Sequence, residues 1–457
     1  MEIKPFCAYR FDGSVTGNAG QCIAPPYDVI DSKLQQALYD ANPYNIVRAI
    51  LGKVMPSDTQ TNNQYTRARE YLEKAIADGA LKQDPQPAIY AYVQDFAIGP
   101  KTYRRSGIIA LGKIEPFGQG VQPHEKTLDG PKADRLRLTR ATASQFGQIF
   151  MLYDDPQKTA EAIIQKASAG NPVLDHTDTE NVRHRIYMIA QQDMIKTFAA
   201  MIQTRKTIIA DGHHRYETAL NYWKQTGHPD AQYLMMTFVN MHNEGLVIQP
   251  THRLINHVTH FSIDKLISEL KGEFDPIIKF DFTDDTSKAK ARQAMFSRMT
   301  QAGSEGKNIF GIYAANHAFY TVTLKDTAAM KKVAPAMSDA ARSLDVNVLH
   351  LLILEKHLGI GDKQLAEESH IEYIKDIGDA IDQSIQKVDS GRCQAVFFVN
   401  PTRIDQVQAV AAAGEKMPQK STFFYPKVFS GVTIHRLPIA PMEPYDNRPL
   451  TQCIGKE

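Results

Sequence analysis

The stretch TIIADGHHRYETAL at residues 207–220 joins an apolar run to a polar turn and then to a helical pattern. Residues 207–210 are typical of a buried strand, and Gly212 marks the turn before a helix that ends near Gly227. A strand that passes through a glycine turn into a helix is a recurring unit of α/β proteins. The stretch therefore predicts a mixed α/β fold.

Strand patterns continue on both sides of this stretch. Apolar runs at Ala88–Phe96 and Gly107–Ile114 flank the turn dipeptide Gly99-Pro100, which predicts a hairpin. A second hairpin is expected at Tyr233–Met241 and Leu246–Gln249, around a polar turn.

The alternation of strands and helices starts again near Ser262. We therefore expect an N-terminal catalytic region at residues 1–255 and a C-terminal α/β region at residues 256–457. Further strands are expected at Gln148–Tyr153, Asn308–Tyr313, Ala318–Thr323 and Ala395–Val399. Helices are expected at Thr66–Ala80, Pro156–Ala169, Ile189–Gln203, Ile263–Gly272, Val346–Leu358 and Ile404–Ala413.

The turn after residue 210 has the composition of an anion site. A helix N-terminus offers free backbone N–H groups and a partial positive charge, so it binds anions well. Arg215 adds a fork of donors suited to a phosphate, and His213 and His214 add donors or a general acid. Asp211 can hold a histidine tautomer, bind a metal, or accept from a ligand amine or hydroxyl. The alternative, a helix N-cap with two surface histidines, leaves the grouping of His, His and Arg unexplained.

A second charged motif is His124-Glu125-Lys126-Thr127, in a loop that leads into a helical pattern. Glu125 is a candidate general base for a substrate hydroxyl. Lys126 and the downstream Arg135 can neutralise phosphate oxygens, as phosphoryl transfer requires. The alternative is the solvated, charged start of a helix.

A third motif is the basic loop MPQKSTFFYPK at residues 417–427. Its lysines, Lys420 and Lys427, bracket the hydroxyl residues Ser421 and Thr422 and an aromatic run. Such a loop can hold phosphates through N–H and O–H donors. The alternative is a lone strand at residues 422–425.

A fourth segment, APPYDV at residues 24–29, contains consecutive prolines. The stiff backbone of Pro25-Pro26 can direct Tyr27 and Asp28 into a cleft. A structural turn explains the same pattern, and both interpretations stay open.

Composition favours an enzyme of small-molecule metabolism. Lys plus Arg (52) nearly equal Asp plus Glu (51), so no overall charge gathers nucleic acid or an anionic membrane. The four cysteines form no CxxC pair, which indicates reduced thiols. No apolar run approaches the ~18 residues of a membrane span, and the N-terminus lacks the apolar run of a signal peptide. We expect a cytoplasmic protein without nucleic-acid or membrane partners, and a homodimer stays open. GxxxxGK[ST], HExxH and GxSxG motifs are absent.

Several of these motifs resemble those of the prokaryotic domain-of-unknown-function family 1015 along the full chain. The matching pieces are APPYDV, HEKT, DGHHRYETAL, LDVNVLH (residues 344–350) and MPQKSTFFYPK, in that order. The DGHHR turn also resembles the motif of free-serine kinases of the ParB/sulfiredoxin-like fold. The resemblance implies a ParB/sulfiredoxin-like phosphate-binding core elaborated by additional α/β lobes. It also implies that Asp211, His213, His214 and Arg215 bind or move phosphate, with Glu125 as the base.

Together, residues and resemblance predict a phosphotransferase that acts on free L-serine or O-phosphoserine. ATP, ADP or pyrophosphate is the expected phosphoryl partner, with Mg²⁺ to screen the phosphate charges. We expect Gly212, His213, His214 and Arg215 to hold the transferred group, and the basic loop to hold the rest of the donor. The alternatives are a phosphoserine phosphatase, a ParB-like regulator that binds a nucleotide or DNA, and a structural scaffold. The metal ligands cannot be named from the sequence.

Overall fold

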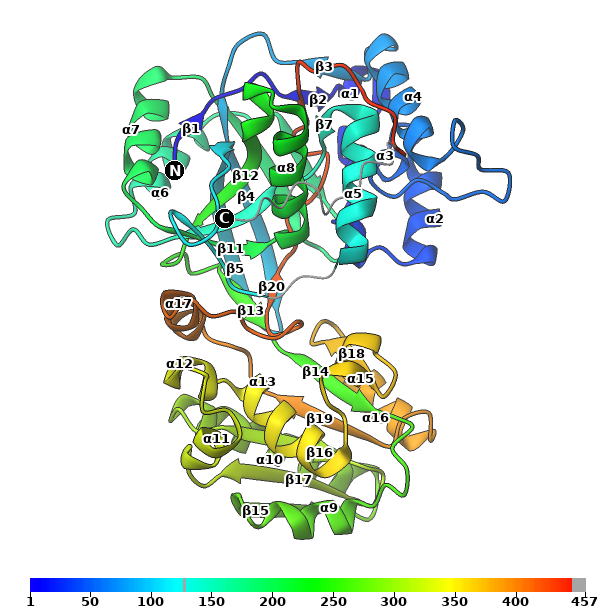
Figure 1. The fold of residues 1–457 in the computed structure, drawn as a ribbon, viewed down its shortest axis with the longest axis vertical. Coiled ribbons are helices and arrows are strands. Elements are labelled where there is room, and N and C mark those ends of the chain that lie inside the picture. Colours follow the sequence, from blue (N-terminus) through cyan, green and yellow to red (C-terminus); the bar gives the residue numbers. More distant parts are fainter. Residues whose placement is uncertain (126–128, 446–457) are drawn as a thin grey trace. The chain divides into compact units, whose positions relative to one another are not determined.

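The computed structural model describes residues 1–125 and 129–445. The chain forms two compact units (Figure 1). Of the described residues, the first unit holds 1–123, 129–247 and 426–445, and the second holds 124, 125 and 248–425. The chain thus leaves the first unit after Val247, earlier than the expected boundary at residue 255, and returns to it at Pro426.

A mixed sheet lies at the centre of the first unit. Its strand order is β6-β11-β8-β12-β5-β4-β10-β9, and β1 pairs with β5. Neighbours are antiparallel except in the pairs β6–β11 and β8–β12. The strands are β1 (Ile3–Lys4), β4 (Ile89–Ile98), β5 (Lys101–Lys113), β6 (Val121–Pro123), β8 (Ile149–Tyr153), β9 (Leu174–Thr177), β10 (Arg183–Ile189), β11 (Thr207–Asp211) and β12 (Tyr233–Asn240).

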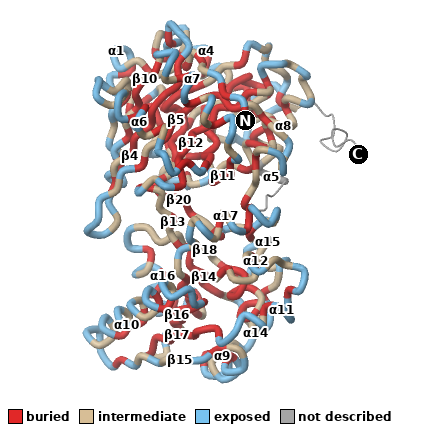
Figure 2. The backbone as a smooth tube through the Cα atoms, turned by 90° about the vertical axis from the view of Figure 1, so that its left-hand side faces the viewer, coloured by how far each residue is buried: buried red, intermediate tan, exposed pale blue. Residues whose placement is uncertain are grey.

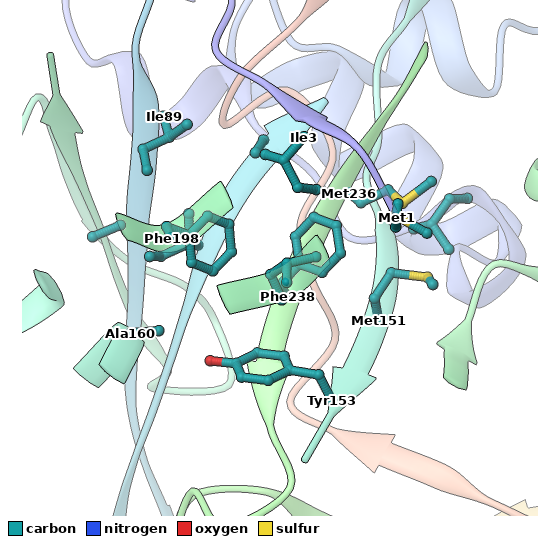
Figure 3. Close-up of a cluster of buried hydrophobic side chains, with 14 of the residues drawn as sticks. Met1, Ile3, Ile89, Met151, Tyr153, Ala160, Phe198, Met236 and Phe238 are labelled. Atoms are coloured by element: carbon teal, nitrogen blue, oxygen red, sulfur yellow. The ribbon is translucent and has the colours of Figure 1, made fainter. Parts of the chain in front are cut away.

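One face of this sheet is apolar. Side chains alternate along a strand, so the odd-numbered residues of β4 from Ile89 to Val93 share this face with Ile108 and Ala110 of β5. Helices α6 (Thr159–Ala167), α7 (Gln192–Gln203) and α8 (His213–Thr226) add apolar side chains to the same cluster. Figure 3 shows part of it, where Phe198 of α7 packs edge-to-face against Phe238 of β12. Ile209 of β11 and Tyr216 of α8 belong to the same cluster, which fixes α8 against the strand that leads into it.

The opposite face carries large polar side chains. Tyr92 and Gln94 of β4, Arg105 of β5 and His184 of β10 are each at most 2% exposed. The returning segment 426–429 covers them and forms hydrogen bonds with three of the four side chains. The central strands of the sheet are buried (Figure 2), and segment 426–429 covers these four side chains.

Smaller elements complete the first unit. Helix α5 (Asp129–Thr142) packs against α8 and against α4 (Gln64–Ala77) (Figure 1). The remaining elements are β2 (Tyr9–Phe11), α1 (Gly13–Thr16), η1 (Ala19–Cys22), η2 (Tyr27–Val29), α2 (Ser32–Ala41), α3 (Val47–Ile50), β3 (Leu81–Gln83), β7 (Ser144–Gln145), η3 (Pro229–Gln232) and β21 (His435–Arg436).

The second unit has an antiparallel sheet with helices on both faces. Its order is β15-β17-β16-β19-β14-β18. One apolar cluster includes residues of α9 and of a π-helix, and the other includes residues of α10 and α16. The strands are β13 (Val247–Gln249), β14 (Thr251–Ile255), β15 (Phe274–Asp281), β16 (Ile309–Tyr313), β17 (Ala318–Leu324), β18 (Ile371–Lys375), β19 (Ala395–Val399) and β20 (Phe423–Tyr425). The helices are α9 (Ile263–Leu270), α10 (Asp285–Ser304), α11 (Ala328–Val333), α12 (Asp339–Arg342), α13 (Asp345–Val348), the π-helix η4 (Leu349–Glu355), α14 (Lys356–Leu358), α15 (Asp362–Glu367), α16 (Ala380–Asp389) and α17 (Ile404–Ala412).

The mixed α/β class predicted from the sequence is confirmed. The hairpin around Gly99-Pro100 forms, with Ile98 opposite Lys101. The second expected hairpin is wrong, because β12 lies between β5 and β8 and has no free edge for β13. Instead β13 pairs with β20.

Candidate phosphate site

The candidate site in the first unit begins where β11 ends. Gly212 connects Asp211 to the first residue of α8 with a φ of 93°, a left-handed conformation that favours glycine. A Cβ at this position would also lie only 3.0 Å from Nη2 of Arg215. The backbone N–H of Gly212 donates to Oδ1 of Asp211 over 2.9 Å. The turn therefore needs glycine both for its conformation and for the space that Arg215 occupies.

Asp211 lies between two cations. Nζ of Lys427 is 3.2 Å from its Oδ2 atom, and Nη2 of Arg215 is 3.9 Å from the same oxygen. Burial alone would raise the pKa of Asp211. The positive charges of Lys427 and Arg215, with the hydrogen bond from Lys427, outweigh burial and lower the pKa below its usual value. Asp211 is therefore ionised at neutral pH.

The guanidinium of Arg215 is held by a backbone carbonyl as well as by the carboxylate of Asp211. Its Nη1 atom donates to the carbonyl oxygen of Gln148 over 2.6 Å, and 17% of its side chain is exposed. Gly147 makes room for it, because a Cβ there would lie 3.1 Å from Nη1. Arg215 also lines a mostly apolar cavity of about 80 Å³ between α5 and α8. Its guanidinium is thus pre-oriented at the start of α8, with part of its surface open to a ligand.

The two histidines of the motif differ in burial. His213 is 7% exposed, whereas His214 is half-buried. Burial lowers the pKa of His214, and the charges of Lys132 and Arg215 add to that effect against the opposing carboxylates of Glu217 and Asp28. A neutral imidazole at pH 7 follows, which can donate one N–H or accept one proton.

Helix α5 places two basic residues near α8. Lys132 forms an ion pair with Glu217. Arg135 pairs with Asp134, donates to the carbonyl oxygen of Ile50 over 2.7 Å, and stacks 4.0 Å above the ring of Tyr27. Through these contacts Arg135 and Tyr27 hold each other in place. Their assignment to phosphate binding stays a prediction.

The second unit gathers another group of the predicted residues. His124 is fully buried, and its Nε2 atom lies 2.8 Å from Oγ1 of Thr422. Glu125 forms a parallel bridge with Met417, whose N–H donates to the carbonyl oxygen of His124 over 2.7 Å. The start of the HEKT motif therefore lies against the first half of the basic loop. Lys126 and Thr127 lie outside the described residues.

The basic loop has a defined local structure in this unit. Ser421 is 6% exposed and donates to the carbonyl oxygen of Pro418 over 2.6 Å. Lys420 has a φ of 60°, and its carbonyl oxygen accepts from Nη2 of Arg253 over 3.1 Å. The loop thus divides between the units, since Lys420, Ser421 and Thr422 belong to the second and Lys427 to the first. That the three motifs line one cleft stays a prediction.

A family model described as "Protein of unknown function (DUF1015)" matches residues 3–347. The chain belongs to the DUF1015 family. No curated protein matches the sequence of this DUF1015 chain.

Three solved structures illustrate what this DUF1015 protein is similar to. A free serine kinase in complex with AMP is 10% identical with a TM-score of 0.31, covering 69% of this chain and 86% of the kinase. SbnI from Staphylococcus aureus, with a C-terminal truncation, is 12% identical with a TM-score of 0.31, over 75% and 92% of the two chains. A conserved hypothetical protein from Pyrococcus furiosus is 12% identical with a TM-score of 0.30, over 70% and 92%.

Two buried arginines of the DUF1015 chain were missed from the sequence. Arg253 lies on β14 without exposure, and Arg105 on β5 is 1% exposed. Burial lowers the pKa of each to about 10, although the charge of Glu125 opposes this at Arg253 and that of Asp211 opposes it at Arg105. Each donates to a backbone carbonyl of the basic loop, Arg253 to Lys420 and Arg105 to Pro426. The signal that could have revealed them is an arginine on the inward-facing side of a strand pattern.

Metal ligands were left open by the sequence. Within residues 1–125 and 129–445, no group of three or more His, Cys, Asp or Glu side chains could hold a metal ion. Asp211 has Lys427 and Arg215 beside it, so it does not offer the bare carboxylate that Mg²⁺ prefers. No helix in the described part of the chain is long and apolar enough to cross a membrane.

Proposed function

We propose that this DUF1015 protein is a phosphotransferase that moves a phosphoryl group between free L-serine and a nucleotide or pyrophosphate. One arrangement carries the proposal. At the start of α8, two cations, Lys427 and Arg215, share one carboxylate, Asp211, beside a helix N-terminus. This surplus of positive charge and of N–H donors suits a phosphate group. The resemblance of the DGHHR turn to the motif of free-serine kinases supports serine as the acceptor.

The chemistry divides between the two units. Glu125 takes the proton from the seryl hydroxyl as the oxygen attacks phosphorus and a new O–P bond forms. The bond from phosphorus to the bridging oxygen of the donor breaks, and the leaving group keeps that electron pair. The leaving group is ADP from ATP, AMP from ADP, or phosphate from pyrophosphate. In the reverse direction protonated Glu125 returns its proton to the seryl oxygen of O-phosphoserine.

The transferred group occupies the N-terminus of α8 in this proposal. The turn at Gly212, the two neighbouring histidines and Arg215 supply its donors, and Asp211 keeps both cations in position. The rest of the donor lies against the basic loop, with Lys126 and Arg135 as further neutralising charges and the Tyr27–Asp28 segment at the rim. Loop residues assigned to the donor are Lys420, Ser421, Thr422 and Lys427.

Mg²⁺ remains part of the proposal as an ion that arrives with the phosphates of the donor. Magnesium in phosphoryl-transfer sites keeps several waters and binds substrate phosphates with few protein carboxylates. None of the steps assigned to Glu125 or Arg215 depends on which residue contacts the Mg²⁺ ion.

The decisive test is an assay for phosphoserine. The protein is incubated with L-serine and, separately, ATP, ADP or pyrophosphate, with and without Mg²⁺, and phosphoserine is measured by mass spectrometry. Formation of phosphoserine with at least one donor supports the proposal. Hydrolysis of O-phosphoserine without any acceptor would instead identify a phosphatase. If the protein instead shifts the mobility of DNA in a salt-dependent way and turns over no donor, the alternative of a ParB-like regulator would be favoured.

A further inference from the structure

The polar face of the first sheet holds the backbone on both sides of Lys427. Arg105 donates to the carbonyl oxygen of Pro426, and Nε2 of Gln94 donates to the carbonyl oxygen of Lys427 over 2.9 Å. One residue beyond Val428, the N–H of Phe429 donates to the hydroxyl of Tyr92 over 3.3 Å. Three strand side chains thus hold three of the four residues from Pro426 to Phe429. The backbone at Lys427 has little freedom to shift.

Arg105 and Gln94 work as a pair. They are opposite each other in the β4–β5 register, and Nη2 of Arg105 is 2.5 Å from Oε1 of Gln94. The amide oxygen of Gln94 is therefore occupied by Arg105, which orients its amide nitrogen toward Lys427. Buried polar networks of this kind fix one geometry because each broken bond leaves a buried donor unsatisfied.

Arg105 is a charged residue whose side chain is almost completely buried. Its guanidinium lies 4.8 Å above the ring of Phe150, and its Nη1 atom has no hydrogen-bond partner among the described residues. Asp211 is the carboxylate whose charge opposes the lowering of its pKa. Lys427 and Arg215 thus act on the Asp211 carboxylate at close range, and the charge of Asp211 in turn favours the ionised form of Arg105. Such a surplus of buried positive charge is costly unless an anion binds nearby.

We propose that Arg105, acting with Gln94, is a positioning residue for Lys427, and that it sets the affinity of the α8 site for polyanionic ligands such as pyrophosphate. Arg105 does so without contacting the ligand. It fixes the backbone from which the Lys427 ammonium reaches Asp211, and its own charge leaves the site net positive. The link to anion affinity rests on the proposed function, whereas the positioning of Lys427 does not.

The first test is a double-mutant cycle on pyrophosphate affinity, measured by calorimetry on the full chain. Arg105→Lys is expected to weaken pyrophosphate binding about tenfold, which corresponds to a loss of ~1.4 kcal/mol in binding free energy. If Arg105 acts through Lys427, the same substitution should cost little further affinity in a Lys427→Met background. Arg104→Lys is the matched control, because Arg104 is the adjacent residue, is 66% exposed and pairs with Asp95. Equal losses from Arg105→Lys in both backgrounds would overturn the proposal.

The second test needs no anion. Lys427 has 14% of its side chain exposed and is paired with Asp211, so it should react slowly with an amine-labelling reagent. In Gln94→Glu the new carboxylate still binds Arg105 but cannot donate to Lys427, so the fold should survive. We expect peptide mass spectrometry to show Lys427 labelled several-fold faster in this variant and in Arg105→Lys. An unchanged labelling rate in the folded Gln94→Glu protein would refute the positioning role. If the wild type binds no pyrophosphate yet labelling accelerates, the proposed function fails and the positioning role stands.

Discussion

Lys427 donates a hydrogen bond of 3.2 Å to Oδ2 of Asp211 across 216 residues of sequence. The bond joins the last residue of the basic loop to the last residue of β11. Both residues belong to the first unit, so this contact is a property of that unit alone. It ties the C-terminal segment to the N-terminus of α8.

Arg215→Ala should impair anion binding far more than folding. The lost hydrogen bond to Gln148 is worth ~1 kcal/mol, which corresponds to a fall in Tm of about 2–4 °C. A charge-assisted bond to a ligand contributes ~1.5–3 kcal/mol, so stabilisation by added pyrophosphate or phosphoserine should vanish. Thermal unfolding with and without ligand measures both effects. Arg183→Ala, at an exposed arginine paired with Asp175, is the control. Full ligand stabilisation in Arg215→Ala would show that the anion binds elsewhere.

Glu125→Gln should separate chemistry from binding. The amide keeps the size of the side chain but cannot take the seryl proton, so turnover should fall by ~10²–10⁴ while ligand affinity changes only a few-fold. Turnover of serine to phosphoserine is compared under saturating donor. Glu372→Gln, in the same unit at a glutamate paired with Lys387, should retain full turnover. Wild-type turnover in Glu125→Gln would move the base elsewhere, with Asp28 or Asp211 as the next candidates.

Asp211→Asn should change how stability depends on pH. The pKa of Asp211 is lowered in the folded protein, so its ionised form contributes stability above the unfolded pKa of ~3.9, and that contribution is lost as pH falls through the folded value. The wild type should therefore be more stable than Asp211→Asn by a constant amount from about pH 5 to pH 8. The difference should shrink below about pH 4, as measured by denaturant unfolding. A difference that grows on acidification would contradict the lowered pKa.

The three motifs should converge on one ligand. A single phosphoryl transfer needs base, phosphate clamp and donor clamp within about a nanometre. A crystal structure with bound O-phosphoserine should show contacts from Arg215 of the first unit and from Glu125 or Lys420 of the second. A ligand bound by Arg215 with both second-unit residues more than about a nanometre away would remove them from the site.

Much of the fold could be predicted because its strands and helices follow simple periodicities. The helix expected at Ile263–Gly272 is observed at Ile263–Leu270, and the strand expected at Asn308–Tyr313 at Ile309–Tyr313. Helix α10 was missed although it is 20 residues long. Its buried residues are small or flexible, namely Ala291, Met295, Met299 and Ala302, and no strong apolar stripe distinguishes them from the polar residues between.

The residues of the site could be predicted better than the contacts between them. Asp211, Gly212 and Arg215 could be identified because a strand, a glycine turn and a helix start are local signals. The contact of Lys427 with Asp211 depends on how the chain returns to the first unit, which no local pattern encodes. Arg105 and Arg253 were missed for a related reason, since a charged residue on a strand is expected to face solvent. Only the packing of another segment over that face shows what each arginine binds.

The return of the chain at Pro426 makes the first unit discontinuous. A fragment ending at Val247 would lack Lys427 and would expose Tyr92, Gln94 and Arg105 to water. Such a fragment could not reproduce the anion affinity of the whole protein, however well its helices formed. Conversely, proteolytic cleavage between the units would leave residues 426–445 attached to the first unit by non-covalent contacts alone, among them the Lys427–Asp211 ion pair, hydrogen bonds and apolar contacts. The phosphate clamp is thus assembled only after most of the polypeptide has been synthesised, which makes its completion a late event in folding on the ribosome.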